Sequence, residues 1–191
     1  MYKLYFISLI GLLLILPIYI VSLRYDYDSP KNWIKKKGIL GIISGWGYFC
    51  FLIGLWIAPQ PKIYSSKEIG IFLRIFLSLP FIASSCYLGI KGVIDLGLET
   101  SETHISKKLI VNGIYRRIRH PQYLGAMLAH VGFSILLNGL YSMLTSPVIL
   151  VYLYIIAKQE EKVLELAFNG EYQKYKERTG MFLSMPIVFK K

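Results

Sequence analysis

Charged residues are scarce in this sequence of 191 residues. Only 17% of the chain is Asp, Glu, Lys or Arg, whereas 54% is hydrophobic, and the mean hydropathy is +0.49. A soluble domain has about a quarter of its residues charged. The composition therefore excludes an ordinary water-soluble globular protein and indicates a membrane protein.

Cysteine is also scarce, and Cys50 and Cys86 stand alone within apolar runs. They lack the CxxC spacing of redox and zinc sites, so we interpret them as packing residues. His130 has no second ligand three or four residues away, which favours a hydrogen bond between helices over a metal role. Because no predicted strand precedes a glycine-rich loop, the sequence also lacks the signature of a phosphate-binding loop. No metal site is expected.

The sequence contains five long apolar runs, at residues 4–23, 39–58, 69–90, 123–137 and 140–157. About 20 helical residues cross the hydrocarbon core, so the first three runs are expected to span the membrane. The last two are shorter and are separated only by Asn138 and Gly139, which predicts a tight helical hairpin with a kink at Pro147. The expected fold class is all-α: a polytopic membrane protein with five transmembrane helices and a cytoplasmic C-terminal helical region.

The basic residues indicate the orientation of this protein. If the five runs alternate across the membrane, 18 of the 22 Lys and Arg residues fall on one side. Basic loops remain in the cytoplasm, so we expect an integral plasma-membrane protein with its N-terminus outside and its C-terminus inside. Topology and attraction to membrane lipids then explain the net charge of +11 without a nucleic-acid partner.

A basic segment precedes the fourth run. Arg116, Arg117 and Arg119 lead into His120 and Pro121. Proline disfavours helix at the residue before it and suits the first helical turn, so a helix should begin near Pro121. A helix start beside three arginines suits an anion such as a carboxylate or phosphate. The alternative is an ordinary membrane helix with snorkelling arginines.

A carboxylate pair follows the fifth run. Glu160 and Glu161 belong to a set of only 11 acidic residues, and a helix continues beyond them. Buried carboxylates are costly, so the pair must face solvent or a cation. Because the hairpin loop is short, the pair should return beside Arg119 and His120 at the same membrane face. This arrangement predicts a site for a ligand that carries charges of both signs.

The second half of the chain resembles a known family, the integral-membrane methyltransferases that include isoprenylcysteine carboxyl methyltransferase and phospholipid methyltransferases. The similarity covers residues 95–186, and we accordingly divide the chain into three N-terminal transmembrane helices (1–94) and a C-terminal catalytic region (95–191). The matching motifs are Leu109 to Tyr115, a hydrophobic stretch followed by Asn-Gly-Ile-Tyr, then Arg119 to Tyr123 with Gly125, and Glu160-Glu161 with Leu164, Phe168, Tyr172 and Tyr175.

The resemblance implies S-adenosyl-L-methionine as cofactor and direct methyl transfer to a lipophilic or lipidated substrate at the cytoplasmic membrane face. Alignment and desolvation can suffice for such a displacement. The implied cofactor contacts are Lys107, Lys108, Leu109, Ile110, Tyr115, His120, Pro121, Gln122, Tyr123 and Glu160. Arg119, His120 and Glu161 are the candidate catalytic residues. Tyr172 and Tyr175 are expected to be interfacial anchors that fold the tail against the site.

One position departs from the prenylcysteine enzymes of that family, which carry an arginine one turn before the acidic pair. Ile156 stands there, and Lys158 is the candidate to bind a substrate carboxylate, as a point charge without the arginine fork. We therefore rank an unspecified lipophilic acceptor above a prenylcysteine carboxylate. Two other classes stay open: a sterol-type reductase that uses NADPH, which has a similar C-terminal motif, and a non-enzymatic membrane protein such as a channel or adaptor.

Overall fold

The computed structural model describes residues 2–28, 46–64, 70–97 and 108–183. These parts of the chain form helices and connecting turns, and the β-bridges among them are isolated. The helices are α1 (Lys3–Asp28), a helix over Trp46–Ile57, α3 (Gly70–Leu96), α5 (Pro121–Leu136), α6 (Leu140–Leu144) and α7 (Ser146–Arg178), with a 3-10 turn, η1 (Gly113–Arg116), before α5. The all-α prediction is confirmed for the described residues.

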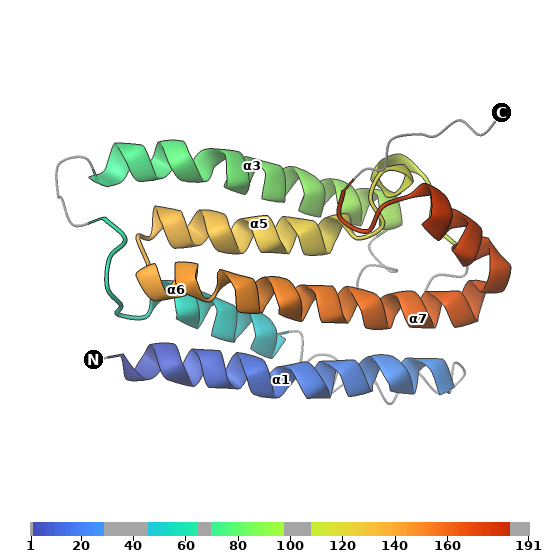
Figure 1. The fold of residues 1–191 in the computed structure, drawn as a ribbon, viewed down its shortest axis with the longest axis horizontal. Coiled ribbons are helices and arrows are strands. Elements are labelled where there is room, and N and C mark those ends of the chain that lie inside the picture. Colours follow the sequence, from blue (N-terminus) through green and yellow to red (C-terminus); the bar gives the residue numbers. More distant parts are fainter. Residues whose placement is uncertain (1, 29–45, 65–69, 98–107, 184–191) are drawn as a thin grey trace.

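The helices lie side by side in an elongated bundle (Figure 1). α5 lies between α3 and α7, and α1 packs against the other side of α7. Near its C-terminal end α7 bends, so that its last turns lie back toward the start of α5 (Figure 1). One end of the bundle thus brings together the end of α3, the start of α5 and the second half of α7.

The predicted hairpin between the fourth and fifth runs is confirmed. Asn138 has a φ of 59°, in the left-handed region that asparagine tolerates, and the chain reverses direction between α5 and α6. The Asn138 side chain accepts a hydrogen bond from the Tyr64 N–H at 2.9 Å and donates one to the Tyr64 carbonyl oxygen at 3.1 Å. These bonds hold the turn against the segment that precedes α3.

The predicted kink at Pro147 is wrong, because the second arm of the hairpin consists of two helices. α6 ends at Leu144, and α7 begins at Ser146 with Pro147 in its first turn. The missing N–H of proline costs no intrahelical hydrogen bond there. Proline therefore starts a helix at this position instead of bending one.

Two described helices are long and apolar enough to cross a membrane, α1 over Lys3–Val21 and α3 over Gly70–Leu96. The helix over Trp46–Ile57 is shorter, and the first part of the second predicted run lies outside the described residues. α5 has 16 residues, fewer than the roughly 20 that cross the hydrocarbon core. The structure thus supports two of the five expected spans.

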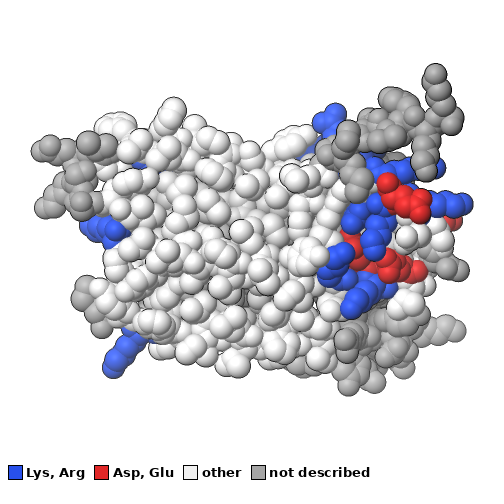
Figure 2. All heavy atoms as spheres, in the orientation of Figure 1, with Lys and Arg blue, Asp and Glu red and all other residues white. Residues whose placement is uncertain are grey.

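The surface of the bundle is apolar along its length and charged at its ends. Figure 2 shows uncharged atoms over the middle of the face in view, whereas most of the charged side chains gather at the end where α7 bends. Cys50 and Cys86, which we interpreted as packing residues, are free and exposed on the surface of the bundle.

Glycines bring α3 and α5 close together. A Cβ atom on Gly125 would lie 3.1 Å from the carbonyl oxygen of Ser85, and one on Gly132 would lie 2.8 Å from Cγ1 of Ile82. Small residues at such crossings let helix backbones approach closely in an apolar environment. This packing holds α5, and with it the first turn of α5, against the end of α3.

His130 and Arg74 form hydrogen bonds between the helices. Trp56 Nε1 donates to His130 Nδ1 at 3.1 Å, which leaves His130 Nε2 to donate to the Ser142 carbonyl oxygen at 3.0 Å. The predicted hydrogen bonding of His130 between helices is confirmed. Arg74 Nη1 donates to the Leu136 carbonyl oxygen at 3.3 Å, at the C-terminal end of α5.

Candidate active site

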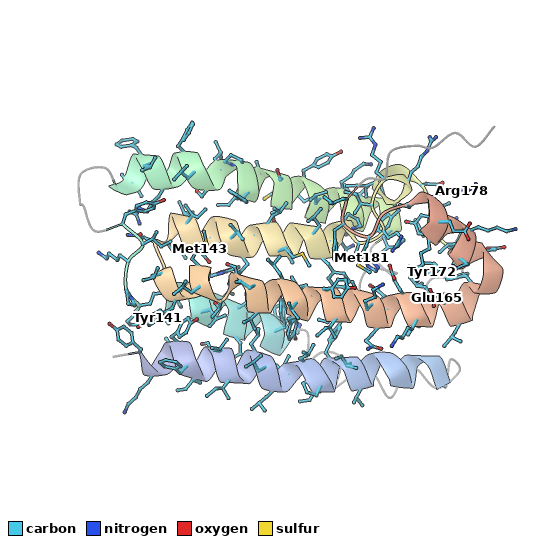
Figure 3. The ribbon with its side chains drawn as sticks, viewed as in Figure 1. Tyr141, Met143, Glu165, Tyr172, Arg178 and Met181 are labelled. Carbon is cyan, nitrogen blue, oxygen red and sulfur yellow. The ribbon has the colours of Figure 1, made fainter. Side chains whose placement is uncertain are left out.

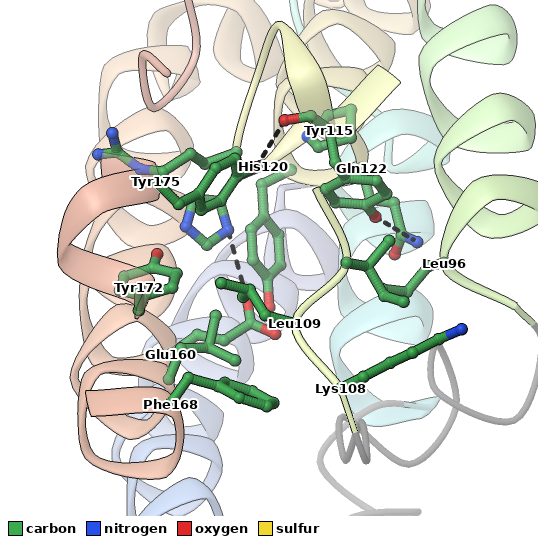
Figure 4. Close-up of a pocket in the computed structure, with 15 residues that line it drawn as sticks. Leu96, Lys108, Leu109, Tyr115, His120, Gln122, Glu160, Phe168, Tyr172 and Tyr175 are labelled. Carbon is green, nitrogen blue, oxygen red and sulfur yellow. Dashed lines mark hydrogen bonds and ion pairs between the residues drawn. The ribbon is translucent and has the colours of Figure 1, made fainter. Parts of the chain in front are cut away.

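An open cavity of about 700 Å³, its mouth included, lies at the bent end of α7. Figure 3 places Glu165, Tyr172 and Met181 at this end of the bundle and Tyr141 and Met143 at the other. The residues that line the cavity, most of them labelled in Figure 4, are Leu96, Lys108, Leu109, Ile110, Tyr115, Arg119, His120, Pro121, Gln122, Tyr123, Glu160, Leu164, Phe168, Tyr172 and Tyr175.

The first turn of α5 forms one wall of the cavity. α5 begins at Pro121, as predicted, and His120 is its N-cap residue. Proline suits this place because the first N–H groups of a helix have no intrahelical partner. Pro121, Gln122 and Tyr123 all line the cavity, so the start of the helix faces it.

Arg119 is buried beside the cavity and is bound to α7. Its Nε and Nη2 atoms both lie 2.8 Å from Glu161 Oε1. Its Nη1 atom donates to the carbonyl oxygens of Lys176, at 3.1 Å, and of Thr179. Arginine commonly caps the free carbonyls at a helix end in this way. Arg119 therefore joins the start of α5 to both the middle and the end of α7.

Of the three arginines in the predicted anion site, Arg119 lines the cavity and the other two do not. Arg116 and Arg117 are exposed, whereas Arg119 is 8% exposed and directs its donors to protein acceptors. A buried carboxylate competes strongly for a guanidinium group because both charges are removed from water. The Arg119 guanidinium is thus engaged by Glu161, and the anion site at the helix start stays a prediction.

His120 lies between the two carboxylates of the acidic pair. Its Nδ1 atom is 3.4 Å from Glu160 Oε2, and its Nε2 atom is 3.4 Å from Glu161 Oε1. The dashed line in Figure 4 marks its contact with Glu160. The prediction that the hairpin returns the acidic pair to the start of the fourth run is confirmed.

The carboxylates and His120 stabilise one another in their charged forms. Burial by itself lowers the pKa of His120, but Glu160 and Glu161 outweigh it and raise the pKa above its ordinary value. Burial by itself raises the pKa of Glu161, but His120 and Arg119 outweigh it and lower the pKa to about 2. The cluster therefore holds charges of both signs within hydrogen-bonding reach.

Two tyrosines of α7 form the opposite wall. Tyr172 is 1% exposed, and its hydroxyl group has no hydrogen-bond partner among the described residues. Tyr175 is partly buried and donates to the Tyr115 carbonyl oxygen at 2.6 Å. Our expectation of interfacial anchors is wrong for Tyr172, which lies in the interior. The helical spacing of Leu164, Phe168 and Tyr172 on one face was the signal that could have placed it in the cavity wall.

The structure brings most of the predicted site residues together. Nine of the ten residues expected at the cofactor line the cavity, and the tenth, Lys107, lies outside the described residues. Leu96 also lines it and was missed, because it precedes the first motif of the resemblance. Glu161 is not in the lining and contacts the cavity residues Arg119 and His120 from behind.

Lys158, which we predicted to bind a substrate carboxylate, does not line this cavity. Its Nζ atom lies 3.6 Å from Glu161 Oε2 and 5.8 Å from the centre of the Tyr154 ring. Ile156 is 4% exposed and belongs to the hydrophobic core of the bundle. The prenylcysteine enzymes carry an arginine where Ile156 stands. Neither Ile156 nor Lys158 supplies a basic group to the cavity lining in its place.

The sequence profile of the phospholipid methyltransferase family matches residues 70–171, just over half of the chain. The chain belongs to this family. The match begins at the first residue of α3, earlier than residue 95, where we placed the start of the resemblance, and it ends within α7. No curated protein and no solved structure matches the chain significantly.

Membership of the phospholipid methyltransferase family makes the protein a membrane methyltransferase. It does not favour the reductase or the non-enzymatic alternatives. The matched range contains most of the cavity lining, namely the end of α3, η1, the start of α5 and α7 as far as Phe168. The residues of the lining that follow it are Tyr172 and Tyr175.

Proposed function

We propose that this protein transfers a methyl group from S-adenosyl-L-methionine to a lipophilic substrate, and that the cavity is its cofactor site. The observation that carries the proposal is the meeting of three separate segments of the chain around this one cavity. Residues 108–110, residues 115–123 and residues 160–175 all contribute to its wall. In the family to which the chain belongs, the expected donor is S-adenosyl-L-methionine, whose sulfonium supplies the methyl group.

The lining fits the chemical parts of this cofactor. Leu109, Leu164 and Phe168 offer apolar surface for the adenine ring. Tyr115 offers an aromatic ring, which attracts a cation such as a sulfonium. The carboxylate of Glu160 suits an ammonium group or ribose hydroxyls.

Tyr172 provides a further test of this fit. Tyr172 lines the cavity, and its hydroxyl is buried with no protein partner among the described residues. Buried polar groups are almost always hydrogen-bonded in native proteins, so this hydroxyl calls for a partner. A cofactor with hydroxyl, amino and carboxylate groups supplies one.

Arg119, His120 and Glu161 act in this proposal by positioning. His120 contacts Glu160 on one side and Glu161 on the other, which restricts where the Glu160 carboxylate can lie. Arg119 holds Glu161 in turn. Methyl transfer depends on alignment of donor and acceptor, so a rigid wall contributes directly to the rate.

We assign the acceptor to lipophilic molecules and place the cavity at the cytoplasmic face of the plasma membrane. The apolar helices and the basic end of the bundle support this placement. We do not propose that the acceptor carries a carboxylate. Lys158, the candidate to bind one, forms an ion pair with Glu161 and does not line the cavity.

Calorimetric titration of the protein in detergent tests the proposal. We expect S-adenosyl-L-homocysteine, the demethylated product, to bind, and NADPH at equal concentration to give no heat. An absence of binding up to about millimolar concentration, the upper range of ordinary substrate affinities, would refute it. Feeding labelled methionine to cells with and without the gene, followed by mass spectrometry of their lipids, would then identify the acceptor.

A further inference from the structure

We propose that Asp95, in the last turn of α3, is a positioning residue that sets the place of Tyr115 in the cavity wall. Asp95 lies outside the motifs of the resemblance and outside the cavity lining. The proposal rests on the proposed function in one respect, that the cavity binds the cofactor.

Asp95 joins α3 to the η1 turn. Its Oδ2 atom accepts a hydrogen bond from the backbone N–H of Ile114 at 2.7 Å. Its Oδ1 atom accepts one from Lys91 Nζ at 2.6 Å, one helical turn earlier. The helix dipole disfavours an acidic residue at the C-terminal end of a helix, so Asp95 does not serve α3 by its charge. Its contribution comes from the bond to η1.

Gly113 of η1 lies so close to the Asp95 carboxylate that no side chain fits between them. A Cβ atom on Gly113 would overlap the carboxylate group of Asp95. Gly113 also has a φ of 58°, in the left-handed region that glycine adopts without strain. The start of the turn is therefore shaped around Asp95, both by the absent side chain and by the backbone conformation.

The η1 turn places Tyr115 in the wall of the cavity. Tyr115 is 7% exposed and lines the cavity. Its hydroxyl donates to the Gly92 carbonyl oxygen of α3 at 3.3 Å and accepts from Gln122 Nε2 at 3.4 Å. Its own carbonyl oxygen accepts from Tyr175 of α7 at 2.6 Å (Figure 4).

The backbone around Tyr115 is thus held from two sides. α7 holds it through Tyr175, and α3 holds it through Asp95 and the Ile114 N–H. Without the Asp95 carboxylate, the Ile114 N–H loses its hydrogen-bond partner on α3. The bond from Tyr175 of α7 to the Tyr115 carbonyl oxygen remains. The ring of Tyr115 then relies on the long hydrogen bonds of its hydroxyl with Gly92 and Gln122, and its position in the cavity wall becomes less well defined.

Three variants separate this role from a general structural one. Asp95→Ala removes the bond to Ile114 and is expected to weaken S-adenosyl-L-homocysteine binding by about tenfold, as for loss of a hydrogen bond to a charged group. Asp95→Asn keeps an acceptor oxygen and should restore binding to within about threefold of wild type. Lys91→Met removes the exposed ion pair alone and should also remain within about threefold.

A second readout needs no ligand. With 3-fluorotyrosine incorporated at position 115, we expect the ¹⁹F resonance to shift in Asp95→Ala and to stay unchanged in Lys91→Met. Should Asp95→Ala fail to fold, Gly113→Ala displaces the same turn with Asp95 intact and should shift the resonance and weaken binding.

Each result decides between the two proposals. An unchanged ¹⁹F resonance in folded Asp95→Ala overturns the positioning role, whatever the ligand does. Equal losses of affinity in Asp95→Ala, Asp95→Asn and Lys91→Met overturn it as well, because loss of the Lys91–Asp95 ion pair would then explain them. A shifted resonance in a protein whose wild type binds no S-adenosyl-L-homocysteine supports the role of Asp95 and rejects the cofactor site.

Discussion

The guanidinium group of Arg119 and the carboxylate of Glu161 form a buried ion pair that joins α5 to α7. The atoms Nη2 and Oε1 are 2.8 Å apart, and the two side chains are 6% and 2% exposed. Loss of one partner of such a pair leaves an uncompensated charge in the interior. The pair therefore governs the stability of the cavity end as well as its shape.

Arg119→Ala should lower the free energy of unfolding by about 3 kcal/mol, because the buried Glu161 would lose its nearest cation and keep only His120, Lys158 and Lys176 at 3.4–3.8 Å. Replacing both residues by methionine should cost less than this single change, since no charge is then left alone. Denaturant unfolding in detergent measures both. Arg117→Ala, at an exposed position, is the control and should change stability by less than about 0.5 kcal/mol. Equal effects at positions 117 and 119 would contradict the importance of the pair.

Glu160→Gln should weaken S-adenosyl-L-homocysteine binding by about tenfold or more, because it removes the charge that we assign to cofactor recognition. Glu177→Gln is the matched control, since Glu177 is exposed near the end of α7 and does not line the cavity. Calorimetry on both variants gives the comparison. If the two changes had the same effect, the cofactor site would lie elsewhere.

Stability should be greatest between about pH 4.5 and pH 6.5. The pKa of Glu161 falls from its ordinary 4.5 to about 2 on folding, so its contribution is present above pH 4.5 and is lost as the pH falls toward 2. The pKa of His120 rises above its ordinary 6.5, so its contribution is present below pH 6.5 and is lost as the pH rises through the folded value. Thermal unfolding as a function of pH checks both limbs. His120→Asn should abolish the alkaline decline, and an unaltered profile would refute this assignment.

Tyr172→Phe should leave the thermal midpoint unchanged or slightly raised, because the hydroxyl that it removes has no protein partner among the described residues. The same change should weaken S-adenosyl-L-homocysteine binding several-fold if the hydroxyl contacts the cofactor. Tyr175→Phe provides the contrast, since it breaks a bond to the Tyr115 carbonyl and should cost about 1 kcal/mol of stability. Unaltered affinity in folded Tyr172→Phe would count against a cofactor contact.

Gly125→Ala should destabilise the bundle by about 1–3 kcal/mol through overpacking. The added Cβ would lie 3.1 Å from the Ser85 carbonyl oxygen and 3.3 Å from the Gly89 nitrogen, and neither backbone atom can move freely. Gly89→Ala, where nothing lies within 4 Å of the added atom, should instead stabilise the protein by up to about 1 kcal/mol. Unfolding measurements on the pair test whether close contact of α3 and α5 limits the stability.

Much of the local structure could be predicted from the sequence. Pro121 determined the start of α5, because its ring lacks an N–H and presets the backbone of a first turn. Asn138 and Gly139 determined the hairpin, since so short a connection forces the two arms to lie side by side. Once the arms are antiparallel, Glu160 must return near His120, and the charged core of the site followed from this connectivity. The Pro147 kink failed because a proline can also begin a helix.

Which groups pair within the site was decided by the tertiary structure alone. Arg119 and Glu161 are far apart in sequence, and no periodicity of either segment reveals that one guanidinium would take up this carboxylate instead of a ligand anion. The burial of Tyr172 depends on the bend of α7, which folds its last turns over the start of α5. Helix starts and tight turns depend on residues that are neighbours in the sequence, so they can be predicted from it. Ion pairs and burial depend on distances between helices, which exist only after the bundle has packed.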